Sequence, residues 1–206
     1  MTVDGRVTLV PLGREFYLRP TLAVAADLVG KVLVHRAPRG VTSGMIVEVE
    51  AYVGEGDPAC HASAGPTARN LPMYGEPGHA YVYLNYGVHA LFNIVTEAAG
   101  CPAAVLVRAL APLEGLALMR RRRARYRGAS RMPDEALCRG PGNLARAMGI
   151  TLKHNRIDLC GSPLSVEDRG FSPGPLVWSR RIGISAGAEK MWRCSVAGHR
   201  SVSAGR

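Results

Sequence analysis

Residues 45–53, which read MIVEVEAYV, constrain the fold of this chain more than any other stretch. Apolar and polar residues alternate along it, and β-branched residues dominate, a pattern that predicts a β-strand. Because successive side chains of a strand point to opposite faces, Glu48, Glu50 and Tyr52 share one face. A half-buried strand with a solvated polar face also explains the pattern. The stretch therefore predicts either an ordinary amphipathic strand or a rigid element that presents two carboxylates and a phenol.

The charge balance of the chain is strongly basic. The formal net charge is +10, and arginine carries most of it, because only Lys31, Lys153 and Lys190 are lysines. A basic, arginine-rich chain predicts a polyanionic partner, with an inert basic surface as the alternative. The length of 206 residues and the 47% of apolar residues are enough for one large domain with a sizeable core.

The spacing of the cysteines disfavours both a disulfide-bonded protein and a zinc protein. All of them stand singly, without a CxxC pair, which disfavours a disulfide framework and a zinc site. They are Cys60, Cys101, Cys138, Cys160 and Cys194. The zinc-deaminase signature is also absent. We therefore expect no metal, no cofactor and a reducing compartment. No run is long and apolar enough to span a membrane, and the beginning of the chain lacks a signal-peptide layout.

The order of predicted elements indicates a single α+β domain over residues 1–206, with flexible ends at about 1–8 and 199–206. Helices are expected over 20–30, from Pro112 onward and over 144–148. In the second of these helices, Leu113, Leu116 and Ala117 are expected to point inward. Strands are expected over 31–36, 45–53, 79–86, 88–96 and 103–110, with shorter pieces between 164 and 196. The Gly-, Pro- and Ala-rich segment 54–78 is long for a loop, which indicates a functional role.

Several residues with chemical potential fall on these strands and loops: Glu50, Tyr52, His61, Tyr83, Tyr86, Asn93 and Arg108. Aromatic faces stack on nucleobases, at about 1–3 kcal/mol per base, and electron-rich rings attract a cationic base. A carboxylate beside a stacked nucleoside could deprotonate water and stabilise positive charge on the sugar. Such a set suits hydrolysis of an N-glycosidic bond. Each residue also has a structural alternative, such as a core tyrosine, a hydrogen-bonded histidine or an ion-paired arginine.

Short motifs follow one another in order from about residue 13 to residue 203. They are IVEVEAY at 46–52, ACH at 59–61, Arg69-Asn70, PGHAYVYLNYG at 77–87, Asn93, VLVRALAPLEG at 105–115 and GPGNL at 140–144. In this order and spacing they resemble the alkyladenine (3-methyladenine) DNA glycosylase family over nearly the whole chain.

The resemblance implies a mono-functional glycosylase of base-excision repair. Such an enzyme flips an alkylated or deaminated purine from duplex DNA and hydrolyses it off, without a cofactor. The implied fold is a curved, mostly antiparallel sheet that forms a partly open barrel with flanking helices. A monomer is expected, associated with the nucleoid in the cytoplasm of a prokaryote or nuclear in a eukaryote.

The resemblance also implies roles for the candidate residues. Glu50 would be the general base that activates water, and the family pattern rather than composition selects it over Glu48. Tyr52, His61 and Tyr83 would sandwich the flipped base. None of the three lysines falls in this set, which favours water over an amine as the nucleophile.

Other residues would hold the base and the DNA. The backbone of Ala59 would bond the base edge, Asn93 would clash with the 2-amino group of guanine, and Arg108 would help to hold the flipped nucleotide. Tyr86 would push into the minor groove and fill the gap in the stack. The remaining DNA contacts would be Arg69, Arg120, Arg121, Gly140, Gly142 and Asn143.

Alternatives stay open for several of these assignments. The arginines of residues 120–127 could form a solvated helix face, and residues 140–143 could be a plain helix cap with Asn143 rather than a phosphate site. For the whole chain the main rival is a non-catalytic nucleic-acid binding module with a stacking platform. A small-molecule nucleoside hydrolase is a weaker rival, because of the +10 charge and the exposed aromatic expected at Tyr86.

Overall fold

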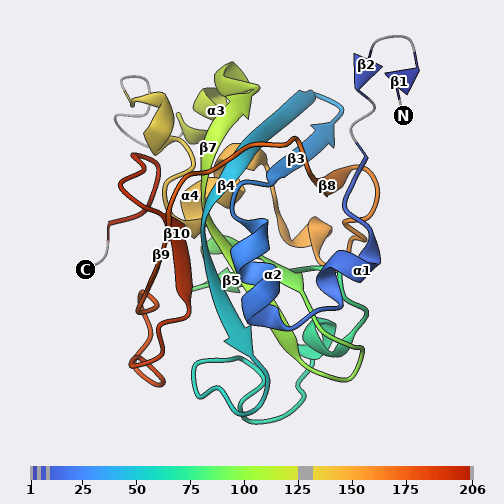
Figure 1. Ribbon diagram of the computed structural model, residues 1–206, viewed down its shortest axis with the longest axis vertical. Helices are drawn as coiled ribbons and strands as arrows, with labels where there is room; N and C mark the ends of the chain where they lie inside the picture. Colours follow the sequence, from blue (N-terminus) through green and yellow to red (C-terminus); the bar gives the residue numbers. More distant parts are fainter. Residues whose placement is uncertain (1, 4–5, 8–9, 125–131, 205–206) are drawn as a thin grey trace.

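The structure, a computed structural model, describes residues 2–3, 6–7, 10–124 and 132–204. Within these residues, eight strands form one antiparallel sheet with the order β5-β6-β7-β4-β10-β9, and β3 joins β4 to β8. The two longest strands, β4 (Gly40–Val53) and β7 (Ala103–Glu114), run together through the middle of the molecule, with β9 and β10 along one side (Figure 1). The sheet curls into a half-barrel, as predicted, and the α+β class is confirmed.

The other elements surround this pair. The remaining strands of the sheet are β3 (Val32–Ala37), β5 (Ala80–Asn85), β6 (His89–Val95), β8 (Leu164–Glu167), β9 (Leu176–Ser179) and β10 (Arg193–Val196). The α-helices are α1 (Arg14–Tyr17), α2 (Thr21–Leu28), α3 (Leu116–Arg123) and α4 (Pro141–Met148). Short 3-10 helices are η1 (Leu71–Tyr74), η3 (Asp134–Ala136) and η4 (Leu152–His154), and β1 (Thr2–Val3) pairs with β2 (Arg6–Val7).

The core lies between the sheet and the helices packed on it. Val47 and Val49 of β4 are fully buried, together with Leu28 of α2. On the opposite face of β4, Glu48 and Glu50 are also fully buried. The predicted alternation is therefore correct, but the polar face is not solvated, which excludes the ordinary amphipathic strand.

Two helix boundaries differ from the predictions. The helix expected from Pro112 begins at Leu116, because β7 continues to Glu114 beside β4. Gly115 makes the turn between them with φ +73°, where an added Cβ would lie 2.3 Å from the Val41 carbonyl oxygen. The buried side chains of α3 are Met119 and Arg123, whereas Leu116 is half-buried and Leu113 and Ala117 are exposed.

The helix expected over 144–148 begins three residues earlier, at Pro141. Proline is tolerated at the first helical position because its missing N–H would have no partner inside the helix. No helix among the described residues is long and apolar enough to cross a membrane.

Candidate active site

A cavity of about 360 Å³ opens beside the β5–β6 hairpin. Its walls come from the end of β4, the loop after it, strands β5 to β7 and residues 182–184. All six residues predicted to bind substrate line it: Tyr52, Ala59, His61, Tyr83, Asn93 and Arg108. The structure thus brings residues from five segments into one place.

Two irregularities in the pairing of β4 with β7 orient the charged groups beside this cavity. The register shifts between Ile46 and Glu48 and again between Glu48 and Val49. Bulges of this kind redirect a side chain and are frequent next to active sites. Arg108 lies at the second shift, with Nε 2.9 Å from Glu48 Oε1 and Nη1 3.1 Å from Glu50 Oε1. One guanidinium group therefore contacts both carboxylates.

Glu48 is the more fully hydrogen-bonded carboxylate. Arg193 Nε donates to it at 2.8 Å, and Ser203 donates from its hydroxyl at 2.6 Å and from its backbone N–H at 2.7 Å. Burial alone would raise the pKa of Glu48, but the charge of Arg108 and the bonds from Ser203 and Arg193 outweigh it and lower the pKa. Glu48 therefore links β4 to β7, to β10 and to the 199–204 segment.

Glu50 has fewer partners and lies directly behind the cavity wall. Its Oε2 accepts from the Tyr52 hydroxyl at 2.9 Å, and its Oε1 accepts from the Ile182 N–H at 2.7 Å. The side chain is fully buried and does not line the cavity, but Tyr52, Ile182 and Arg108 all do. Three residues that bond to the carboxylate thus also line the cavity.

A cluster of aromatic rings forms another part of the cavity wall. The ring centroids of His61 and Tyr83 lie 4.5 Å apart, and those of Tyr81 and Tyr83 lie 5.3 Å apart. Burial raises the pKa of Tyr83 to about 12, in spite of the charge of Arg69. Burial, and then Arg69, lowers the pKa of His61, whose Nδ1 lies 2.8 Å from the Tyr81 hydroxyl. These rings are thus neutral at pH 7.

Asn93 lies at the back of the cavity and is almost fully buried. Its Nδ2 donates to the backbone carbonyl of Tyr81 at 3.1 Å, across the β5–β6 pair. The amide is therefore held in one orientation by the strand beside it.

Comparison with known proteins agrees with this geometry. Residues 15–200 match the family described as methylpurine-DNA glycosylase. The chain belongs to this family. It is therefore a DNA glycosylase, and the predicted family and enzyme class are confirmed.

Relatives in bacteria and archaea carry a related name. The chain is 50% identical to a Chlorobium phaeobacteroides protein over 88% of this chain and 89% of that protein. It is 49% identical to a Methanocella arvoryzae protein over 88% and 90% of the two chains. It is 47% identical to a Rhodopseudomonas palustris protein over 93% of this chain and 90% of that protein. All three are named "Putative 3-methyladenine DNA glycosylase".

The glycosylase contains a buried ion pair beside the cavity that sequence patterns do not reveal. Arg181 donates to both carboxylate oxygens of Asp57, at 2.5 and 2.7 Å, and both side chains are fully buried. The same guanidinium lies over the rings of Tyr52, at 4.7 Å, and Trp192, at 5.2 Å. Arg181 precedes Ile182, so this pair fixes the backbone that donates to Glu50. Residues 57 and 181 lie far apart in the sequence, so no local sequence pattern indicates that they form an ion pair.

The residues predicted to contact DNA are not all in one place. Tyr86 lines the mouth of the cavity at the tip of the hairpin and is 89% exposed. Its φ of +49° is rare for a bulky residue, and no packing around the exposed ring explains it. Arg69 lies with its guanidinium 5.1 Å from the Tyr83 ring centroid and donates to the Leu84 carbonyl.

The second group of predicted DNA contacts lies on α3 and α4. Arg120 is engaged within the protein, because it donates to the Asp134 carboxylate and the Met132 carbonyl. Arg121 and Gly142 line a different cavity, and Asn143 donates to the Arg139 carbonyl instead of capping α4, whose N-cap is Gly140. The rest of the 120–127 run includes positions outside the described residues. No three His, Cys, Asp or Glu side chains in the described chain are grouped to hold a metal ion.

Proposed function

We propose that this glycosylase excises 3-methyladenine and related alkylated purines, and deaminated purines such as hypoxanthine, after flipping them from duplex DNA. The observation that carries the proposal is the cavity itself. One wall is made of neutral aromatic rings, and a fully buried carboxylate lies directly behind another. Stacking on such rings favours a flat base, and electron-rich faces favour one that is positively charged.

In the proposed reaction Glu50 accepts a proton from a water molecule, whose oxygen forms the new bond to C1′ of the deoxyribose. The bond from C1′ to the purine nitrogen breaks, and its electron pair leaves with the base. A purine alkylated at a ring nitrogen, such as 3-methyladenine, carries a positive charge, so it leaves as a neutral molecule without an acid. Hypoxanthine is neutral in the nucleotide, so it takes up a proton from water as it leaves. Arg108 remains cationic, since the charges of Glu50 and Glu48 raise its pKa although burial would lower it.

Water is the proposed nucleophile because no lysine lines the cavity among the described residues. Lys31 pairs with Asp168, and Lys190 lies over the Trp192 ring. Lys153 lines the other cavity. An amine nucleophile would form a Schiff base with the sugar, whereas water leaves an intact abasic site.

A panel of duplexes, each with one damaged purine, tests this function. We expect release of the free base and an abasic strand that breaks only after alkali. Tight binding of every duplex without release would favour the non-catalytic binding module. Trapping of a covalent protein–DNA adduct by borohydride would overturn the water mechanism while leaving excision itself intact.

Tyr86 is proposed to insert into the stack where the base has left it, and Tyr86→Ala is expected to shift flipping back toward stacked DNA. Unstacking costs a few kcal/mol, and the inserted ring offsets part of it. The loss should be large for lesions that still pair well and smaller for unpaired ones. Stopped-flow fluorescence of a fluorescent lesion base measures the flipping equilibrium.

The control for this prediction is the free energy of unfolding of the Tyr86→Ala variant. Because the ring is 89% exposed, Tyr86→Ala should hardly alter the free energy of unfolding. An unchanged flipping constant, or a variant that unfolds, would make Tyr86 a structural residue.

Asn93 is proposed to exclude guanine through a clash with its 2-amino group. Asn93→Ala is expected to release undamaged guanine measurably faster, because the buried amide that fills the back of the cavity is removed. The measurement is single-turnover release from undamaged and damaged duplexes of the same sequence. If the ratio of the two rates does not change, the selective contact lies elsewhere.

A further inference from the structure

Strand β5 lies at one end of the main sheet and carries Tyr81 and Tyr83, two of the aromatic rings in the wall of the candidate active site. On the side away from β6, β5 bonds to the irregular segment 155–159. There the Ala80 N–H donates to the Ile157 carbonyl oxygen at 2.8 Å. The strand that carries the two rings is therefore held by the segment that follows η4.

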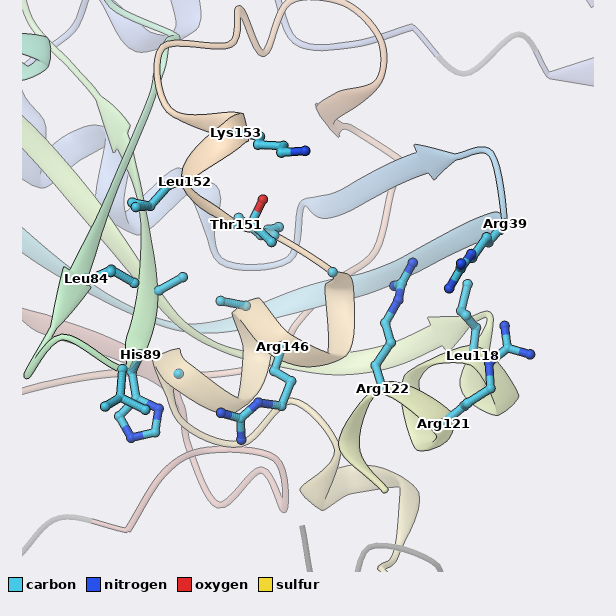
Figure 2. Close-up of a pocket in the computed structure, with 16 residues that line it drawn as sticks. Arg39, Leu84, His89, Leu118, Arg121, Arg122, Arg146, Thr151, Leu152 and Lys153 are labelled. Carbon is cyan, nitrogen blue, oxygen red and sulfur yellow. The ribbon is translucent and has the colours of Figure 1, made fainter. Parts of the chain in front are cut away.

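Side chains extend this contact between β5 and η4. The Val82 N–H donates to the Asn155 side-chain oxygen at 3.0 Å, one residue after the end of η4. Figure 2 shows the Leu152 side chain of η4 extending toward the strand that carries Leu84. Because η4 and the segment 155–159 are continuous, a contact that fixes η4 also fixes the outer edge of β5.

Two histidines from distant parts of the chain fix η4. Its last residue is His154, whose Nε2 lies 3.3 Å from Nε2 of His35, a buried residue of β3. The two rings cross at 87°, with their centroids 4.8 Å apart. His35 Nδ1 lies 2.7 Å from the Met148 carbonyl oxygen, and the Thr151 N–H donates to His154 Nδ1 at 3.0 Å. The pair of rings thus ties η4 to β3 and to the end of α4.

These contacts define the tautomer of each ring. A carbonyl oxygen only accepts, so His35 carries its hydrogen on Nδ1 and accepts at Nε2. A backbone N–H only donates, so His154 accepts at Nδ1 and carries its hydrogen on Nε2. The His154 Nε2–H therefore donates to His35 Nε2. All four ring nitrogens have a partner, but only while both rings are neutral.

A proton on His35 removes the acceptor of the bond between the rings. Both Nε2 atoms would then carry hydrogen and face each other, and the buried ring would be charged. A proton on His154 is less disruptive, because its Nδ1–H could donate to the hydroxyl or the carbonyl oxygen of Thr151, each 3.3 Å away. Protonation of His35 is therefore the event that breaks the pair.

The surroundings of His35 oppose its protonation. Burial above all, and then the charges of His154 on η4 and Arg122 on α3, lower the pKa of His35, although the carbonyl bonded to its Nδ1 raises it. Its register partners are Thr42 on β4 and Leu164 on β8, which do not titrate. In the described structure the contacts of the two rings include no carboxylate that could hold an imidazolium.

We propose that His35 and His154 form a pH-sensitive latch, which positions β5 for base binding while both rings are neutral and releases η4 when His35 takes up a proton. The effect on base binding rests on the proposed function, whereas the release of η4 does not. In the unfolded chain His35 has the ordinary histidine pKa of about 6.5. Because its pKa is lower in the folded chain, the folded form binds fewer protons. The latch therefore stabilises the fold fully above about pH 6.5, and this contribution is lost as the pH falls through the folded pKa.

NMR of the free protein tests the tautomers and the release. At neutral pH, ring ¹⁵N spectra should place the hydrogen of His35 on Nδ1 and that of His154 on Nε2. Between neutral pH and about pH 5, the protection of the Ala80 and Val82 amides against hydrogen exchange should fall severalfold. The Val49 amide of β4, in the middle of the sheet, should lose much less protection over the same range.

Variants that do not titrate at position 35 make the test specific. In His35→Gln a side-chain oxygen can accept from His154 Nε2–H at every pH, so protection of β5 should persist at acidic pH. In His35→Leu the bond is missing at every pH, so protection should be low and should not respond to the latch. The matched control is His199→Asn, in which an amide oxygen can still accept from the Ser201 N–H, as His199 Nδ1 does. This variant should keep the pH dependence of the parent.

The affinity for a lesion duplex relative to an abasic duplex gives the functional readout, because only the first places a base against the aromatic rings. In the parent this ratio of affinities should fall severalfold at acidic pH, and in His35→Gln it should fall less. The titrating groups of the cavity are the same in both proteins, so their effect cancels in the comparison.

Three results would overturn the latch. They are ring hydrogens on the opposite nitrogens at neutral pH, equal loss of β5 protection in the parent and in His35→Gln, and an affinity ratio that does not change when protection is lost. If His35→Gln does not fold, the ring spectra and the amide protection of the parent still decide. Failure of the proposed function would instead appear as absence of base release by the parent at neutral pH, and it would leave the hydrogen-exchange result unaffected.

Discussion

Glu50→Gln is expected to abolish excision while leaving lesion binding intact or tighter. General-base catalysis contributes about 10²- to 10⁴-fold, so the single-turnover rate should decrease by at least about a hundredfold. The fold should survive, because a glutamine oxygen can accept from Ile182 N–H and Arg108, and its amide can donate to the Tyr52 hydroxyl. Arg108 also keeps its bond to Glu48. A rate within tenfold of the parent would show that Glu50 is not the base.

Glu48→Gln is the matched control for this prediction. All the groups around Glu48 donate, namely Arg108, Arg193 and the N–H and hydroxyl of Ser203. A glutamine keeps one accepting oxygen, but its NH2 group cannot accept and would face at least one of these donors. Breaking a buried charged pair costs about 3–5 kcal/mol. We therefore expect lower thermal stability but excision that is retained at temperatures where the variant is folded. Equal loss of excision in both variants would contradict the assignment of Glu50.

Asp57→Ala and Arg181→Leu are each expected to destabilise the protein by about 3–5 kcal/mol, because each leaves a buried charge without its partner. Excision should decrease as well, since Ile182 N–H is then no longer held against Glu50. Urea unfolding gives the free energy, and the single-turnover rate at a temperature where the variant is folded gives the second effect.

Two comparisons make this prediction specific. The double variant Asp57→Ala and Arg181→Leu should be less destabilised than the sum of the single variants, because no unpaired charge remains. Lys31→Gln removes an ion pair whose carboxylate is half exposed and should change the free energy by less than about 1 kcal/mol. Single variants at 57 and 181 as mild as Lys31→Gln would mean that the pair does not hold the site together.

The strands could be predicted because their signal is local. Alternation over 45–53 and 79–86 indicates β4 and β5, and it correctly places Tyr81 and Tyr83 on one face. The end of β7 could not be predicted in this way. Pro112 looks like a helix start, but pairing with β4 keeps the backbone extended as far as Glu114.

The sequence by itself determined the α+β class and the residues that line the cavity of the candidate active site, because strand alternation and motif order are properties of neighbouring residues. Only the tertiary structure decided what the two carboxylates do. Glu48 and Glu50 have the same local pattern, but residues 145 and 155 positions away bind Glu48, whereas a backbone N–H 132 positions away binds Glu50. The register shifts at Arg108 and the Asp57–Arg181 pair depend on such distant partners too. Chain folding creates these contacts, and no short stretch of sequence encodes them.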